Sequence, residues 1–281
     1  MTPDLCTRTY TITDREFELF RDLIFRQTGI HLSDRKKNLV VARLSKRLRA
    51  LDLENFTEYY RFLTERPDAS SELVNLVNRV TTNKTDFFRE NHHFDFLRGD
   101  VLPEILENAS RGGPKKLRIW SAGCSTGEEP YSIAMTVHDF FSNERGWDIK
   151  ILATDLDTEV LGFAYRGVYP SQRVAPVPGP FLTKYFERTA EGYSVKRQIR
   201  DMVIFRRLDL MDAMFPLKSQ VDVIFCRNVM IYFNDETKAS LVGKFHRHLR
   251  NDGYLFIGHS ESLMHMKDLF TFVRHTVYRK V

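Results

Sequence analysis

Residues 118–130 read RIWSAGCSTGEEP, and this stretch decides the fold class of the chain. The apolar residues at 117–120 predict a strand. The small residues at 121–127 let a backbone approach a ligand closely, and glycine adopts turn conformations that other residues resist. The acids and proline at 128–130 are typical of the first turn of a helix. A strand, a small-residue turn and a helix in this order indicate the cofactor loop of a doubly wound α/β domain.

The glycines alone are a weak signal. Gly123 and Gly127 do not complete the Gly-x-Gly-x-x-Gly spacing, and a structural turn explains them about as well. No lysine follows them, which excludes a P-loop. Glu128 and Glu129 would repel a pyrophosphate, whereas they would suit a cationic ligand that carries an amino group and a sulfonium. The acids therefore favour S-adenosylmethionine over a dinucleotide.

Composition narrows the class of protein further. The chain has 281 residues, enough for one large domain or two smaller ones, and its net charge of +5 does not by itself indicate nucleic acid. Three scattered cysteines fit a reducing compartment without a disulfide framework. We find no signal-peptide pattern and no apolar run long enough to span a bilayer. A soluble, cytoplasmic protein without direct membrane insertion is expected.

The chain divides into a helical part and an alternating part. Residues 1–80 show helical periodicity without strand signals and predict an all-helical domain. Residues 81–281 alternate between strands and helices, which predicts a parallel sheet with helices on both faces and a closing antiparallel hairpin at 270–281. Residues 168–200 break this rhythm and predict a loop and a small antiparallel hairpin inserted into the main domain. The expected strands are 117–122, 149–154, 202–206, 221–226 and 253–258, and the expected helices between them are 128–141, 157–166 and 235–249.

Polar residues follow several of the predicted strands, at the sheet edge where ligands bind in such folds. Asp155 ends the second strand, where an acid usually accepts a ribose hydroxyl, although capping the next helix explains it about equally well. Asp209 and Leu210 follow the third strand and suit an adenine edge and face. The fourth strand ends in Arg227 and Asn228. Tyr232 comes soon after, and on spacing alone simple packing is the favoured explanation of that tyrosine.

Five motifs together resemble one known family. They are WSAGCSTGEEPYS, ATDLDTEVL, IFCRNVMIYF, GHSES and, at 81–90, TTNKTDFFRE. In this order and over nearly the whole chain they resemble the bacterial chemotaxis receptor methyltransferases, the CheR family. The resemblance implies an N-terminal helical domain and a class I S-adenosylmethionine-dependent methyltransferase domain with an inserted small antiparallel β-subdomain. It also implies methyl transfer from S-adenosylmethionine to glutamate side chains of chemoreceptors, which gives glutamate methyl esters and S-adenosylhomocysteine.

The resemblance also assigns site residues. Arg89 and Tyr232 match residues that orient the substrate or the methyl group, and Asp209 departs from the asparagine that is usual at its position while keeping an acceptor oxygen. The cofactor-binding positions implied by the family motifs are Asn83, Thr85, Arg89, Glu128, Asp155, Asp209, Leu210, Arg227 and Asn228.

Residues 35–49 form a basic helix without an acid. A charge run is usually a solvated face, but the receptor substrate implied by the resemblance is an acidic helical bundle that such a face could steer. We therefore predict that Arg43, Lys46 and Arg47 bind the receptor. The paired histidines, such as His92 and His93, lack the spacing of a metal site backed by cysteine or a third ligand, so no metal is expected.

Two other functions compete with a receptor methyltransferase. A non-catalytic cofactor-sensing or scaffold module would show a broken cofactor constellation, which we do not find. An RNA methyltransferase would show aromatic residues among the basic ones, and 35–49 has none. Some family members first dock on a receptor C-terminal pentapeptide through a longer, glycine-containing hairpin loop, whereas the turn at 189–192 is short. We therefore expect no pentapeptide tether, no nucleic acid partner and a monomer.

Overall fold

The computed structural model describes residues 9–81, 83–264 and 266–281, so Cys6 and His265 lie outside the described residues. The chain forms two compact units. The helical unit consists of Met1–Thr82 with Tyr232–Asn234, and the sheet unit consists of Asn83–Ile231 with Asp235–Val281. Within the described ranges, no helix is both long and apolar enough to cross a membrane.

The helical unit begins at a capping box. The Thr13 hydroxyl accepts a hydrogen bond from the Glu16 backbone N–H at 3.2 Å, and the Glu16 carboxylate accepts one from the Thr13 N–H at 2.9 Å. Gly29, with φ of 69°, ends this first helix in the left-handed conformation. The elements of the unit are α1 (Asp14–Thr28), η1 (Asp34–Lys36), α2 (Lys37–Ala50), α3 (Phe56–Glu65) and α4 (Ser70–Val80).

Aromatic and aliphatic side chains fill the core of the helical unit. Phe20 of α1 packs edge-on against Phe56 and stacks on Tyr59 of α3, with ring centroids 5.7 Å apart in both pairs. Leu44 and Leu48 of α2 are fully buried in the same unit. The apolar stripe that predicted this helix from the sequence therefore faces the core.

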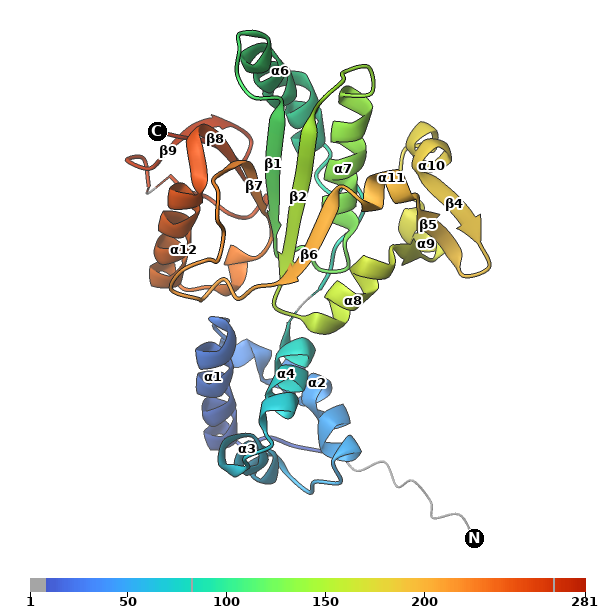
Figure 1. Cartoon of the computed structure of the whole chain (residues 1–281). Coiled ribbons are helices and arrows are strands. Elements are labelled where there is room, and N and C mark those ends of the chain that lie inside the picture. Colours follow the sequence, from blue (N-terminus) through green and yellow to red (C-terminus); the bar gives the residue numbers. More distant parts are fainter. Residues whose placement is uncertain (1–8, 82, 265) are drawn as a thin grey trace. The chain divides into compact units, whose positions relative to one another are not determined.

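The sheet unit is built on a seven-stranded sheet of order β6-β2-β1-β7-β8-β10-β9. Strand β1 pairs in parallel with both β2 and β7, while β10 runs antiparallel to β8 and β9. Figure 1 shows β1, β2 and β6 side by side. The strands are β1 (Lys116–Ala122), β2 (Asp148–Asp155), β6 (Val203–Arg207), β7 (Val221–Cys226), β8 (Leu249–Ile257), β9 (Phe270–Arg274) and β10 (Val277–Lys280).

Helices connect these strands and precede the first of them. Helix α7 begins directly after the small-residue loop that follows β1, and its residues 128–137 are all buried. The helices of the main fold are α5 (His92–Phe96), the π-helical turn η2 (Leu97–Val101), α6 (Leu102–Ser110), α7 (Glu128–Phe140), α8 (Thr158–Arg166), the turn η3 (Met230–Tyr232) and α12 (Asp235–His248).

The insertion forms a separate three-stranded antiparallel sheet of order β3-β5-β4, which lies to one side of the main sheet in Figure 1. The predicted hairpin is present, but the predicted loop before it contains two short helices that begin after Pro170 and Pro178. The hairpin ends at Val195, before the predicted bound of 200, because Arg197–Arg200 form a helix. The insertion contains β3 (Val168–Tyr169), α9 (Ser171–Val174), α10 (Gly179–Tyr185), β4 (Phe186–Thr189), β5 (Gly192–Val195) and α11 (Arg197–Arg200).

Candidate active site

The small-residue loop after β1 bends tightly against the end of β2. The backbone N–H groups of Gly123 and Cys124 both donate to the Thr154 carbonyl, at 2.8 and 2.9 Å. Gly123 has φ of 84°, and a Cβ atom there would lie 2.4 Å from Val229. Glycine is therefore required at this position by both conformation and space.

Asp155 receives two backbone hydrogen bonds at the end of β2. Its Oδ2 accepts from the Ser125 N–H at 2.8 Å, and its Oδ1 accepts from the Asp157 N–H at 3.0 Å. Burial raises the pKa of Asp155 to about 6, although these two hydrogen bonds by themselves would lower it. Asp157, not Asp155, caps α8 by accepting from the N–H groups of Glu159 and Val160. The capping explanation of Asp155 is therefore wrong, and its remaining lone pairs are left for a ligand hydroxyl.

Glu128 is the first residue of α7, and only 1% of its surface is exposed. Its Oε2 accepts from the Thr126 hydroxyl at 2.7 Å, and Arg173 Nη1 of the insertion lies 3.0 Å from its Oε1. Oε1 accepts no hydrogen bond among the described residues, and burial raises the pKa of this carboxyl. A buried carboxylate oxygen that still lacks a hydrogen-bond donor fits the amino group of S-adenosylmethionine.

Glu129 does not share this surrounding. Its Oε1 accepts from the Ser121 hydroxyl at 2.7 Å, and its Oε2 accepts from Arg227 Nη1 at 3.2 Å. Both oxygens of Glu129 thus accept hydrogen bonds from the protein, so among the described residues Glu128 is the one of the two acids with an oxygen that accepts none.

Arg227 is a buried guanidinium held between two carboxylates. Besides Glu129, its Nη2 lies 3.2 Å from Glu90 Oε2 and donates to the Arg89 carbonyl. These contacts join the end of β7 to the start of α7 and to the segment before β1. Its assignment as a cofactor contact stays a prediction, and its partners point to a positioning role. Glu90 thus pairs with Arg227 and not with its sequence neighbour Arg89.

The segment 83–90 is tied to the loops at the sheet edge. Asn83 Nδ2 donates to Asp157 Oδ2 at 2.7 Å, and the Asn83 carbonyl accepts from the Ser125 hydroxyl at 3.1 Å. Thr85 and Arg89 are half-buried on the same segment, and Arg89 Nη1 donates to the Lys84 carbonyl at 2.9 Å. The structure thus ties Asn83 to the edge that carries Asp155, while the roles of Thr85 and Arg89 stay predictions.

Asn228 has a left-handed backbone with φ of 60°. Its N–H donates to Glu261 Oε2 at 3.1 Å, and its Nδ2 donates to Glu90 Oε1 at 3.3 Å. Glu261 also accepts from the N–H groups of Ile231, at 3.2 Å, and Gly258, at 2.5 Å. This buried carboxylate fixes the backbone after β7. From the sequence, Glu261 was used only as part of the GHSES motif and was given no role. Its three donors are backbone N–H groups that only the folded chain brings together.

Asp209 and Leu210 follow β6 and are half-buried. The N–H of the preceding Leu208 donates to the Asp155 carbonyl at 3.1 Å, which keeps this turn next to Asp155. Asp209 Oδ1 accepts from the Met211 N–H at 2.8 Å, and burial raises the pKa of Asp209. Sequence reasoning placed these residues on the correct sheet edge.

The predicted receptor-binding residues of α2 behave differently from one another within the helical unit. Arg47 forms a two-point ion pair with Glu72 of α4, at 2.8 and 2.6 Å, and Tyr59 donates to the same carboxylate. Arg43 donates to the backbone carbonyls of Val80 and Thr81 at 2.5 and 3.1 Å. Lys46 is exposed. The picture of one basic face presented to solvent is therefore corrected for the two arginines, which fasten α2 to α4.

Tyr232 also lies in the helical unit, where its carbonyl accepts from the His31 N–H at 2.8 Å. Its side chain is half-buried. The structure gives this residue a packing environment, and its proposed role in orienting the substrate stays a prediction.

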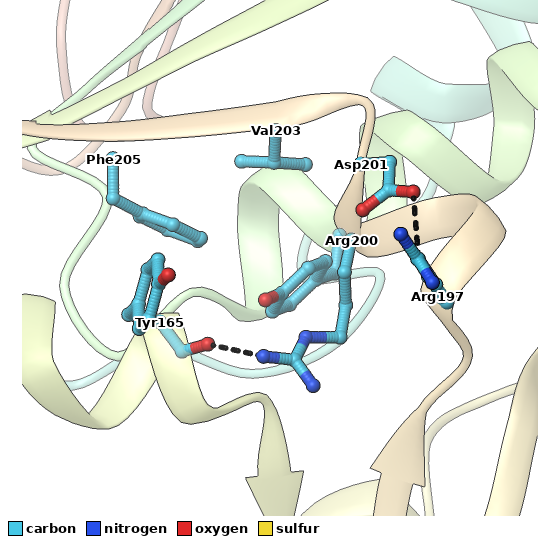
Figure 2. A pocket seen from close by; sticks show the side chains of 7 residues that line it. Tyr165, Arg197, Arg200, Asp201, Val203 and Phe205 are labelled. Atoms are coloured by element: carbon cyan, nitrogen blue, oxygen red, sulfur yellow. Dashed lines mark hydrogen bonds and ion pairs between the residues drawn. The ribbon is translucent and has the colours of Figure 1, made fainter.

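A separate open pocket of about 390 Å³ lies beside the edge strand β6 (Figure 2). Arg200 Nη2 donates to the Tyr165 carbonyl at 3.1 Å, and Arg197 pairs with Asp201 at 3.3 Å, so both arginines have partners in the pocket wall. None of the predicted cofactor residues lines it. Its lining residues are Tyr131, Tyr165, Arg197, Arg200, Asp201, Val203 and Phe205.

Two family models match the chain. Residues 15–81 match the model described as CheR methyltransferase, all-alpha domain, and residues 83–279 match the model described as CheR methyltransferase, SAM binding domain. The chain belongs to the CheR methyltransferase family. Membership confirms the predicted fold class, an all-helical domain followed by an S-adenosylmethionine-binding methyltransferase domain.

Relatives match over almost the full length. The chain is 41% identical to a chemotaxis protein methyltransferase of Borreliella burgdorferi, over 96% of this chain and 95% of the relative. It is 40% identical to chemotaxis protein methyltransferase 2 of Pseudomonas aeruginosa, over 98% and 96%. It is 38% identical to the chemotaxis protein methyltransferase of Escherichia coli, over 97% and 93%. A solved magnesium protoporphyrin IX methyltransferase with bound SAH is only 13% identical, with a TM-score of 0.34 over 76% of this chain and 70% of that one.

Proposed function

We propose that this chain transfers a methyl group from S-adenosylmethionine to glutamate side chains of methyl-accepting chemotaxis proteins, forming glutamate methyl esters and S-adenosylhomocysteine. The observation that carries the proposal is the pair of carboxylates at the edge formed by β1 and β2, the buried Glu128 and the half-buried Asp155. One suits an amino group and the other a ribose hydroxyl, in a member of a methyltransferase family. The predicted partner is the cytoplasmic helical bundle of a receptor.

The chemistry needs little help from proton transfer. S-adenosylmethionine, when bound, supplies a methyl group on a sulfonium that a carboxylate oxygen can attack in line. A glutamate acceptor has a reference pKa near 4.3, so at neutral pH it is already a carboxylate and needs no general base. What the protein contributes is positioning and a dry site.

The remaining site residues are proposed in supporting roles. Asn83 and Thr85 hold the segment that covers the cofactor, while Asp209 and Leu210 face the adenine. Arg89 and Tyr232 orient the acceptor carboxylate, with Tyr232 the better final orienter because a strong charge-assisted bond from arginine would lower the nucleophilicity of the oxygen. If Tyr232→Phe leaves the methylation rate unchanged while cofactor still binds, the role of Tyr232 is wrong.

The main test uses S-adenosylmethionine with a labelled methyl group and receptor cytoplasmic fragments. We expect base-labile label on the receptor, and loss of that label when the acceptor glutamates are changed to glutamine. Asp155→Asn should lower both labelling and cofactor affinity, while Glu107→Gln, which alters an exposed acid of α6 paired with Arg111, should change neither. Label that is stable to base, or that persists on the glutamine forms, contradicts the proposal.

We also propose that methylation proceeds without a pentapeptide tether. Strands β4 and β5 are joined by only Ala190 and Glu191, so the hairpin lacks the longer loop of tether-binding members. A calorimetric titration with a receptor C-terminal pentapeptide should show no micromolar binding. Binding in that range would overturn this part of the proposal and leave the methyltransferase assignment intact.

A further inference from the structure

A cluster of metal-ligating side chains begins at the end of the segment 83–90, and its two histidines have no role in the site described above. Glu90, His92 and His93 each offer one ligand atom, and these atoms all lie within 4.8 Å of one another. The sequence argument against a metal counted no carboxylate beside the histidine pair, and Glu90 supplies one. The three residues differ in exposure, since His93 is fully buried, Glu90 is half-buried and His92 is exposed.

The ring of His93 is oriented by groups of the β9–β10 turn. Its Nε2 lies 3.2 Å from the His275 carbonyl and 2.8 Å from the Thr276 hydroxyl. A carbonyl can only accept, so this contact assigns the proton of the neutral ring to Nε2. The lone pair of Nδ1 then points away from the turn. An N–H donated to a backbone carbonyl is the usual arrangement of a histidine that binds a metal through its other nitrogen.

Glu90 presents an oxygen to that lone pair. Glu90 Oε2 lies 3.6 Å from His93 Nδ1, and both atoms are buried without a hydrogen-bond partner among the described residues. The other oxygen, Oε1, accepts from Asn228 Nδ2 at 3.3 Å and from the His259 N–H at 3.4 Å, which fixes the carboxylate. Two facing acceptors without a hydrogen between them repel each other, whereas a cation between them would be attracted to both.

We propose that Glu90, His92 and His93 bind a zinc ion. Two imidazole nitrogens and one carboxylate oxygen are a known zinc ligand set, with bonds of about 2.1 Å that place tetrahedral ligands about 3.4 Å apart. The 3.6 Å separation of Glu90 Oε2 and His93 Nδ1 fits this spacing. The exposed His92 completes the set by turning toward the other two, and water takes the fourth position.

The nearby arginine does not cancel the attraction for a cation. Arg227 Nη2 lies 3.2 Å from Glu90 Oε2, but Arg227 Nη1 lies at the same distance from Glu129 Oε2. Two carboxylates thus share one guanidinium, and the group carries an excess of one formal negative charge. A zinc ion at Glu90 would leave Arg227 paired with Glu129.

The test titrates the full-length, untagged protein with Zn²⁺ against a chromogenic chelator. We expect one Zn²⁺ per chain, with affinity weakened at least tenfold by His92→Ala and likewise by Glu90→Gln. His92 is exposed, so its variant should fold. His31→Ala, which alters an exposed histidine of the helical unit, is the matched control and should leave zinc affinity unchanged.

Co²⁺ in place of Zn²⁺ identifies the ligands by absorption. We expect d–d bands of a nitrogen- and oxygen-ligated ion that disappear in His92→Ala. If the wild type binds Zn²⁺ no more tightly than His92→Ala and Glu90→Gln do, the proposal is wrong. A thiolate charge-transfer band would also overturn it, because the metal would then be held by cysteine.

Discussion

Helix α2 and the end of strand β7 both carry arginines that the sequence predicts to be functional. In the structure these arginines join different parts of the molecule. In the helical unit, Arg47 joins α2 to Glu72 of α4. In the sheet unit, Arg227 joins the end of β7 to Glu90 and Glu129, next to the candidate cofactor residues. The basic residue alone does not reveal its role. The acids that the fold places beside an arginine determine whether that arginine joins two helices or positions residues of the site.

Replacing Arg227 should have the largest effect of the variants considered. Arg227→Met leaves the carboxylates of Glu90 and Glu129 without their buried cation, which should cost about 3–5 kcal/mol of unfolding free energy. Urea unfolding followed by circular dichroism measures it. Arg111→Met, at an exposed ion pair with Glu107, is the control and should unfold like wild type. A loss at Arg227 no larger than that at Arg111 would show that the cluster is not tightly coupled.

Replacing Arg47 tests the other half of the comparison. Arg47→Ala leaves Glu72 with only uncharged donors, including Tyr59, and should lower the unfolding free energy by about 2–3 kcal/mol. Thermal unfolding measures the change, and Lys46→Ala provides an exposed neighbour as control. Unchanged stability combined with lost receptor methylation would return Arg47 to the receptor-binding role predicted from sequence.

The acidity of Asp155 predicts a pH-dependent cofactor affinity. A ribose hydroxyl donates to the ionised carboxyl, so cofactor binding favours the deprotonated form of a group whose pKa is about 6 in the free protein. Affinity should therefore be constant at higher pH and fall below pH 6, by up to about tenfold per pH unit. Calorimetry from pH 5 to 8 measures it. Asp155→Asn should bind the cofactor more weakly, and its affinity should not fall below pH 6. If the affinity of the variant still falls there, another group is responsible for the titration.

The smallest effect is expected at Lys46. It is exposed on α2 without an ion pair among the described residues, so Lys46→Ala should leave stability unchanged. If an acidic receptor approaches this helix, methylation should fall about two- to fivefold at low salt and converge with wild type at higher salt. Initial rates at two ionic strengths measure this. Equal rates at both salt concentrations would remove α2 from the receptor surface.

Local signals predicted most of the fold. The capping box at Thr13, the strand at 221–226 and the helix after the loop at 121–127 depend on neighbouring residues, which sequence displays directly. Helices α9 and α10 of the insertion were not predicted, because prolines in this stretch suggested a loop. In the structure Pro170 and Pro178 immediately precede those helices, at positions where proline is tolerated.

The candidate site was predictable only in part. Glu128, Asp155 and Asp209 each follow a strand, so their place at the sheet edge could be inferred from topology. The partners of Glu129 and Arg227, 98 positions apart, could not be inferred, because no local pattern records which buried charges meet. The role of Glu261 could not be inferred for the same reason. The partners of Arg43 and Arg47 could not be predicted, because helical periodicity gives a face but not its neighbours, and the receptor-binding role of these arginines stays a prediction.

Tyr169 of the insertion reaches the cofactor loop of the main fold. Its hydroxyl donates to the Thr126 carbonyl at 2.7 Å, its ring packs edge-on against Phe87, and a Cβ atom at Gly127 would lie 2.8 Å from the same hydroxyl. A relative that lost the insertion would lose this wall and would have to rebuild Thr126 and Gly127 together. The root of the insertion therefore forms one packed unit with the loop at 121–127, and a change of shape in one requires a change in the other.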